Sequence, residues 1–151
     1  MTVGRRRRST ESGASLVEFA MVMPLLLVLV FGIMESGWLF SQLTETRNAA
    51  REGARLAVVD YGTASQVALE TCNRAVLSSG GATVAVSSSG NVSDPINDPT
   101  ASVTVAIDNS YESLTGFLDP FFQGRSLDAT VIMRVERPLT NLAGPASELC
   151  P

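Results

Sequence analysis

The stretch "GASLVEFAMVMPLLLVLVFGIMESGWLFSQLTETRNAAREGARLAVV" at residues 13–59 decides how this chain is organised. Residues 16–40 are mostly apolar and would extend about 37 Å as an α-helix, which is enough to cross the hydrocarbon core of a bilayer. The uncharged centre of this run, residues 19–34, is shorter, at about 24 Å. Glu18 and Glu35 lie at its two ends, so each needs a polar interface or a neutralising partner. We interpret Glu35 first as an interfacial residue and second as a partner for a cation of another subunit.

The same helix is predicted to continue beyond the apolar run to about residue 60. Small residues recur along one of its faces, and within the apolar run Gly32 and Ser36 form a small-x-x-x-small pair. Such positions allow two helices to approach closely, although ordinary composition explains any single pair as well. Pro24 lacks an amide hydrogen, so a kink or a locally unwound turn is expected there. The small residues of the extension are Ala49, Ala50, Gly53, Ala54 and Ala57.

The composition leaves few groups for catalysis. All 11 basic residues are arginines, and without lysine or histidine the usual imidazole base and Schiff-base amine are missing. No nucleotide-binding, hydrolase or metalloprotease motif occurs, so we expect no enzyme, no cofactor and no metal site. Beyond residue 13 the arginines number seven against 14 acidic residues, which argues against nucleic-acid binding.

Two cysteines, Cys72 and Cys150, lie far apart and match no metal-ligand spacing. In an oxidising compartment they would form a disulfide worth about 4–5 kcal/mol by the loop-entropy model. The alternative is that Cys72 is a small buried residue and Cys150 a terminal thiol.

Four consecutive arginines, residues 5–8, precede the apolar run and predict that the N-terminus stays in the cytoplasm. We expect three parts: a basic cytoplasmic leader at residues 1–13, a transmembrane and extended helix at 14–60, and an extracytoplasmic domain at 61–151. A cleaved secretory signal is disfavoured because the helical pattern simply continues after the apolar run.

The outer part is predicted to be α+β. Gly62 is the expected stop of the long helix, and Thr63 with Gln66 forms a capping box that opens a second helix reaching about Ser78, with Leu69 and Cys72 on its inner face. The sequence then alternates with a period of two at residues 83–87, 102–107 and 129–136, which predicts a three-stranded antiparallel sheet covered by the helices.

The segment "YESLTGFLDPFFQG" at 111–124 joins the second and third predicted strands and is unusually apolar for a solvated connection. It is expected either to cover the sheet or to meet a partner. Its aromatic residues and leucines are Tyr111, Leu114, Phe117, Leu118, Phe121 and Phe122.

The residues Gly13-Ala14-Ser15-Leu16-Val17-Glu18-Phe19 resemble the processing site of type IVb prepilins: a glycine, then a glutamate five residues later, then an aromatic residue, after a basic leader. Residues 13–59 as a whole are similar to the TadE-like family of minor pilins or pseudopilins of the tight-adherence (Flp) pilus system. The elements that carry this similarity are Pro24, Gly32-Ile33-x-Glu35 and Asn48-Ala49-Ala50-Arg51-Glu52-Gly53-Ala54-Arg55.

The resemblance implies cleavage by a prepilin peptidase between Gly13 and Ala14. It also implies that Glu18 pairs with the new α-amino group of a neighbouring subunit, an attraction of opposite charges in a low dielectric. Implied partners are related minor pilins, the major pilin, the pilus assembly platform and membrane lipid, in a role in pilus assembly or priming that serves cell adhesion. The alternatives are an interfacial Glu18 and an uncleaved single-pass anchor whose outer domain binds a surface partner.

Overall fold

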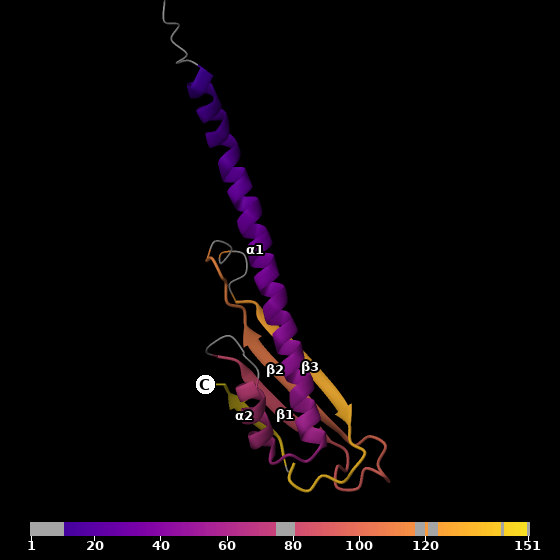
Figure 1. Ribbon diagram of the computed structural model, residues 1–151. Coiled ribbons are helices and arrows are strands. Elements are labelled where there is room, and N and C mark those ends of the chain that lie inside the picture. Colours follow the sequence, from indigo (N-terminus) through magenta and orange to yellow (C-terminus); the bar gives the residue numbers. More distant parts are fainter. Residues whose placement is uncertain (1–10, 75–80, 117–119, 121–123, 143, 151) are drawn as a thin grey trace, which may run out of the picture.

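The computed structural model describes residues 11–74, 81–116, 120, 124–142 and 144–150. It consists of a long helix, α1 (Glu11–Val58), a short helix, α2 (Ala64–Arg74), and a four-stranded sheet. The C-terminal half of α1 lies across one face of the sheet beside α2, and its N-terminal half projects away from the domain (Figure 1). The predicted basic leader lies almost entirely outside the described residues.

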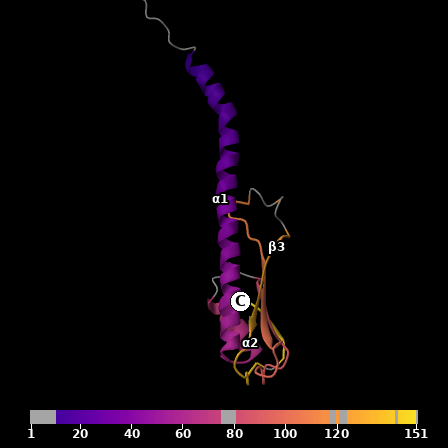
Figure 2. The same cartoon turned by 90° about the vertical axis from the view of Figure 1, so that its right-hand side faces the viewer.

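Helix α1 is uninterrupted for 48 residues and contains Pro24. The predicted unwound turn is therefore absent, because the helix absorbs the proline without losing its α-helical assignment. The N-terminal, indigo part of α1 is tilted from the axis of the rest of the helix, as Figure 2 shows. A bend of this kind is what a proline inside a helix produces.

Helix α1 ends at Val58, and the left-handed residue that terminates it is Asp60 and not Gly62 as predicted. Asp60 adopts a left-handed conformation with φ of 57°, and its amide donates to the carbonyl of Ala57 while the amide of Tyr61 donates to that of Leu56. This is a Schellman ending, for which aspartate is tolerated as well as glycine. The Asp60 carboxylate accepts four hydrogen bonds from Thr140 and Asn141, which ties the end of the helix to the C-terminal part of the chain.

The capping box at the start of α2 is confirmed. The Thr63 amide donates to Gln66 Oε1 at 3.0 Å, and the Gln66 amide donates back to Thr63 Oγ1 at 3.3 Å. The predicted inner face is only partly right, because Cys72 is buried but Leu69 is 43% exposed. The buried face also contains Val67, Ala68 and Thr71. Residues 75–78 of the predicted helix lie outside the described residues.

The sheet has four antiparallel strands in the order β3-β2-β1-β4, so the prediction of three strands is wrong by one. Strands β1 (Thr83–Ser89), β2 (Ser102–Ser110) and β3 (Ser126–Arg134) correspond to the three predicted runs. The missed strand, β4 (Ala146–Leu149), is four residues long and pairs with the first half of β1. Its sequence, "ASEL", has too little apolar alternation to signal a strand.

The core lies between the sheet and the two helices. Alternate residues of β1 and β2 are fully buried there, as the period-two pattern predicts. They meet small residues of α1 and the buried face of α2. The sheet side of the core consists of Val84, Val86, Val103, Val105 and Ile107.

Candidate functional site

In the part of the chain that the structure describes, residues 13–30 of α1 are all exposed. In the most apolar 18-residue window of the helix, mean hydropathy is 2.6 and no residue is buried. Leu16, Met21 and Leu25 are each about 70% exposed or more. In water this surface would be strongly unfavourable, whereas a bilayer would solvate it. The described chain contains no other helix long and apolar enough to cross a membrane.

The predicted processing site lies at the very start of this helix. Gly13 and Ala14 fall within the first four residues of α1, where amide groups have no partner inside the helix, and both are exposed. Glu18 follows about one turn later and is also exposed. Among the described residues, a Cβ atom added to Gly13 would meet nothing within 4 Å. Gly13, Ala14 and Glu18 are therefore all exposed to the surroundings of the helix.

Glu35 is the most unusual residue of the helix, because it is charged and only 1% exposed. The segment after β2 folds against it and donates five hydrogen bonds. Oε1 accepts from the Tyr111 hydroxyl, from Ser113 Oγ at 2.5 Å and from the Leu114 amide at 3.2 Å. Oε2 accepts from the amide and the hydroxyl of Thr115 at 3.3 and 2.9 Å.

Two more side chains of α1 extend this contact. The carbonyl of Glu112 accepts hydrogen bonds from Trp38 Nε1 at 3.0 Å and from Gln42 Nε2 at 2.7 Å. Glu35, Trp38 and Gln42 are spaced three and four residues apart, so they share one face of the helix. We call these three residues together with residues 111–115 the Glu35 clamp.

The clamp gives Glu35 partners that the sequence did not predict. Both oxygens of the carboxylate are occupied by donors of its own chain, where a cation of another subunit was the second interpretation. The first interpretation, a position at the membrane interface, stays a prediction. Paired in this way, a charge is tolerated next to an apolar span. The clamp fixes the β2–β3 connection along α1, at the level where the helix enters the domain (Figure 1).

The apolar β2–β3 connection is described only in part. Residues 111–115 belong to the clamp, and Leu114 within it is 50% exposed. The predicted roles of Phe117, Leu118, Phe121 and Phe122 lie outside the described residues.

The small-residue face of α1 packs within the chain. Ala50, Ala54 and Ala57 are completely buried, and a Cβ atom added to Gly53 would come within 2.6 Å of Thr71 Oγ1 and 3.2 Å of Val105 Cγ1. The small residues of this face therefore allow α2 and the sheet of the same chain to pack closely against α1. Gly32 and Ser36 lie further towards the N-terminus and differ, because the Ser36 hydroxyl donates to the Gly32 carbonyl at 2.7 Å and a Cβ atom added to Gly32 would meet nothing within 4 Å among the described residues.

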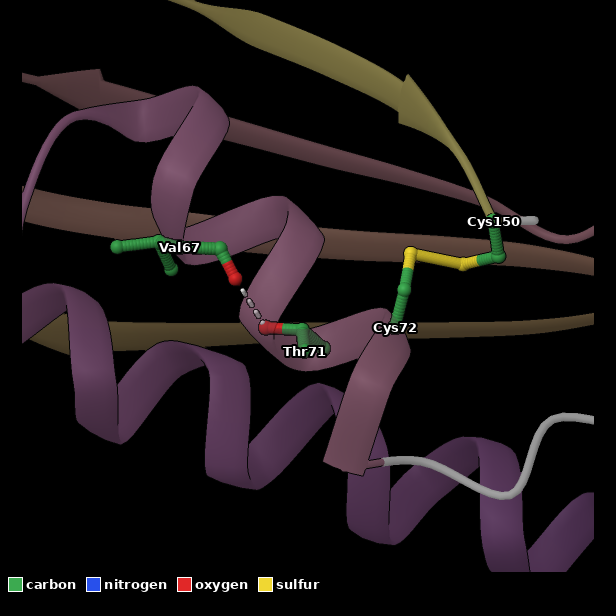
Figure 3. Close-up of a disulfide and its surroundings, with 4 residues drawn as sticks. All are labelled: Val67, Thr71, Cys72 and Cys150. Atoms are coloured by element: carbon green, nitrogen blue, oxygen red, sulfur yellow. Dashed lines mark hydrogen bonds between the residues drawn. A yellow bond between two sulfur atoms is a disulfide. The ribbon is translucent and has the colours of Figure 1, made fainter.

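Cys72 and Cys150 are joined by a disulfide, with their Cα atoms 5.4 Å apart (Figure 3). Cys72 lies near the end of α2 and Cys150 directly follows β4, whose edge the bond ties to the helix. The Cys150 amide also donates to the Ala82 carbonyl at 2.8 Å. In the described residues no group of three or more cysteines and acidic residues is placed to hold a metal ion.

The exposed apolar helix runs without a break into a folded α+β domain that is closed by a disulfide. This arrangement suggests the class of proteins that are held in a membrane by a single spanning helix. The family model described as "TadE-like protein" matches residues 13–55, so the resemblance to the TadE-like family is confirmed over that part of the chain. The match begins at Gly13 and covers the apolar span, Glu35 and most of the small-residue face. Neither the curated proteins nor the solved structures give a match.

Proposed function

We propose that this chain is a non-catalytic subunit of a tight-adherence pilus, a TadE-like minor pilin or pseudopilin that inserts as a single-pass prepilin and takes part in pilus assembly or priming. The observation that carries the proposal is the form of α1. One helix presents a fully exposed apolar half and uses its other half as the core of a folded domain. Because one continuous helix forms both parts, any movement of the membrane span also moves the folded domain.

Two features support a cytoplasmic N-terminus and an extracytoplasmic domain. Arginines 5–8 precede the span and favour a cytoplasmic N-terminus. The Cys72–Cys150 disulfide belongs to an oxidising compartment, which supports an extracytoplasmic position for the domain. Partners in this arrangement are membrane lipid, the prepilin peptidase, the assembly platform, related minor pilins and the major pilin.

Processing would change the charge at the start of α1. Cleavage between Gly13 and Ala14 removes the basic leader and creates an α-amino group four residues before Glu18. Glu18 is exposed on the span, where an isolated carboxylate is costly. Pairing with the new amine of a neighbouring subunit would neutralise both groups, and it becomes available only after cleavage.

The test is the intact mass of the protein extracted from membranes of a host with an active prepilin peptidase. A mature chain that begins at Ala14 is expected, and Gly13→Ala should retain the leader. Gly37→Ala is the matched control, because Gly37 is an exposed glycine of the same helix where an added Cβ atom would meet nothing within 4 Å among the described residues. Wild-type protein that keeps its arginine-rich leader would leave the uncleaved anchor as the remaining function.

The role of Glu18 is tested by co-purification with the pilins. Glu18→Ala should insert in the membrane and keep its disulfide, but should recover fewer pilin subunits than the wild type. Glu45→Ala, which removes an exposed carboxylate lower on the same helix, serves as the control. Equal recovery from all three proteins would rule out the charge pairing while leaving the cleavage assignment intact.

A further inference from the structure

A cavity of about 240 Å³ lies between α1 and the start of β3, and we call it the Arg125 pocket. The start of β3 is the end of the sheet nearest the projecting half of α1 (Figure 1). Its position is fixed by the Glu35 clamp, because the Tyr111 amide donates to the Arg125 carbonyl at 3.1 Å and the Tyr111 hydroxyl donates to Glu35. The lining includes Leu39, Phe40, Leu43, Tyr111, Arg125 and Leu127.

The Arg125 pocket lies at the depth of lipid headgroups. A hydrocarbon core of about 30 Å takes up about 20 helical residues, roughly residues 18–38 when it is centred on the apolar run. Leu39 then lies about 1.5 Å beyond its edge and Leu43 about 7.5 Å beyond it, across a headgroup layer of about 5–8 Å. Trp38 and Tyr111 lie at this level too, and membrane proteins are enriched there in tryptophan and tyrosine.

The lining of the pocket combines an apolar surface with one positive charge. Arg125 is exposed, and among the described residues it takes part in no ion pair. Phe40 is 66% exposed, so much of its ring is left for a ligand. None of the described residues that line the pocket is acidic. The site therefore suits an anionic group attached to an apolar body, and it offers no carboxylate to an ammonium group.

The size of the pocket indicates that it holds part of a larger molecule. Its volume of about 240 Å³ is below the range of about 300–1,000 Å³ that is usual for sites of whole small molecules. The pocket is also continuous with the exposed apolar surface of α1, since Leu39 and Phe40 end the apolar run. A glycerophospholipid matches both features, because its phosphate and glycerol can fill the pocket while its acyl chains follow the span.

We propose that the Arg125 pocket binds the headgroup of an anionic glycerophospholipid, such as phosphatidylglycerol, from the extracytoplasmic leaflet. Arg125 pairs with the phosphate, for which a guanidinium group is well shaped, and Leu39 and Phe40 contact the glycerol and the first methylene groups. The bound lipid holds the start of β3 at the bilayer surface. This inference rests on the anchoring in the proposed function and does not depend on cleavage after Gly13.

The experiment titrates the full chain, purified in mild detergent, with dioleoylphosphatidylglycerol and measures bound lipid by native mass spectrometry. One lipid per chain should bind, in preference to dioleoylphosphatidylcholine. Arg125→Ala should weaken the binding of phosphatidylglycerol about tenfold, the effect of losing one charge-assisted contact at an exposed site. Leu43→Glu should weaken it similarly, because the new carboxylate would pair with Arg125 and repel the phosphate.

Two controls make the same charge changes outside the pocket. Arg47→Ala removes an exposed arginine one helical turn beyond Leu43, and Thr44→Glu adds a carboxylate at the exposed residue next to Leu43. Neither Arg47 nor Thr44 lines the pocket, so both controls should bind phosphatidylglycerol like the wild type. Disulfide formation in every variant verifies that its domain is folded.

Four results would overturn the inference: wild-type affinity in Arg125→Ala, equal losses in the controls, no preference for phosphatidylglycerol, or displacement of the lipid by inorganic phosphate, which would indicate a site for a free anion. Wild-type affinity in Leu43→Glu would do the same and would leave the pocket to another occupant, such as a protein partner. A chain that is absent from the membrane fraction would refute the anchoring as well. A chain that is inserted but binds no phosphatidylglycerol would refute this inference alone.

Discussion

Removal of the Glu35 carboxylate should release the β2–β3 connection from α1. In Glu35→Ala, two amides and three hydroxyls lose their common acceptor. A hydrogen bond to a charged acceptor contributes about 1.5–3 kcal/mol, but Leu114 and Thr115 are exposed and their donors can turn to water. We therefore expect a loss of about 3 kcal/mol, the lower end of the range for breaking a buried charged contact.

The assay is amide hydrogen exchange on the full chain in detergent micelles. A loss of about 3 kcal/mol in local opening corresponds to exchange about 100-fold faster at Leu114 and Thr115. Trp38, the single tryptophan of the chain, gives a second readout, because its indole donates to the Glu112 carbonyl inside the clamp. Its emission should shift towards that of solvated indole as the segment detaches.

The matched control is Glu45→Ala, which removes a glutamate of the same helix that accepts a hydrogen bond from the Ser41 hydroxyl at 3.3 Å. This variant should change stability by no more than about 0.5 kcal/mol. The reasoning would be refuted by equal exchange at Leu114 and Thr115 in the wild type and in Glu35→Ala, since the clamp would then contribute nothing to holding the segment.

Three further changes probe the domain. Gly53→Ala should destabilise it by about 1–3 kcal/mol in denaturant titrations, because the added methyl group meets Thr71 at 2.6 Å, whereas Gly37→Ala in open space should be neutral or stabilising. Reduction of the Cys72–Cys150 bond should cost about 4–5 kcal/mol, seen as a lower denaturation midpoint with reductant and no such change in a Cys72→Ser, Cys150→Ser variant. Hydrogen bonds, chiefly from the Thr140 hydroxyl, hold the pKa of Asp60 below its ordinary value of 3.8. Its stabilisation is therefore complete above that pH and is lost as the pH falls through the lower folded pKa, so denaturation midpoints measured between pH 7 and 3 should decline less in Asp60→Asn than in the wild type.

Local features of the sequence were sufficient to predict most elements of the fold. The apolar span and the small-residue face of α1 depend on helical periodicity alone, and the Thr63–Gln66 capping box depends on residues three positions apart. The first three strands alternate strongly enough to be recognised, since β1 and β2 each turn every second residue into the core.

Strand β4 and the hydrogen bonds to Glu35 were missed, because both depend on partners that lie far away in the sequence. Strand β4 exists because β1 offers it an edge and the disulfide holds it there, and neither condition is visible in its four residues. The donors that surround Glu35 come from 76 to 80 residues further along the chain. A signal was nonetheless present, because "YESLT" at 111–115 is rich in hydroxyl groups and a charged residue beside an apolar span requires donors.

The disulfide also determines how this molecule responds to tension. Cys72 and Cys150 enclose all four strands in a covalent loop, with a sequence separation of 78 residues. A pulling force that enters through the anchor and leaves through the C-terminal end would cross from Cys72 to Cys150 through the sulfur atoms. The chain between them, which would reach about 260 Å if fully stretched, is thereby shielded from extension. A protein with this cross-link can be strained repeatedly without its sheet being drawn out.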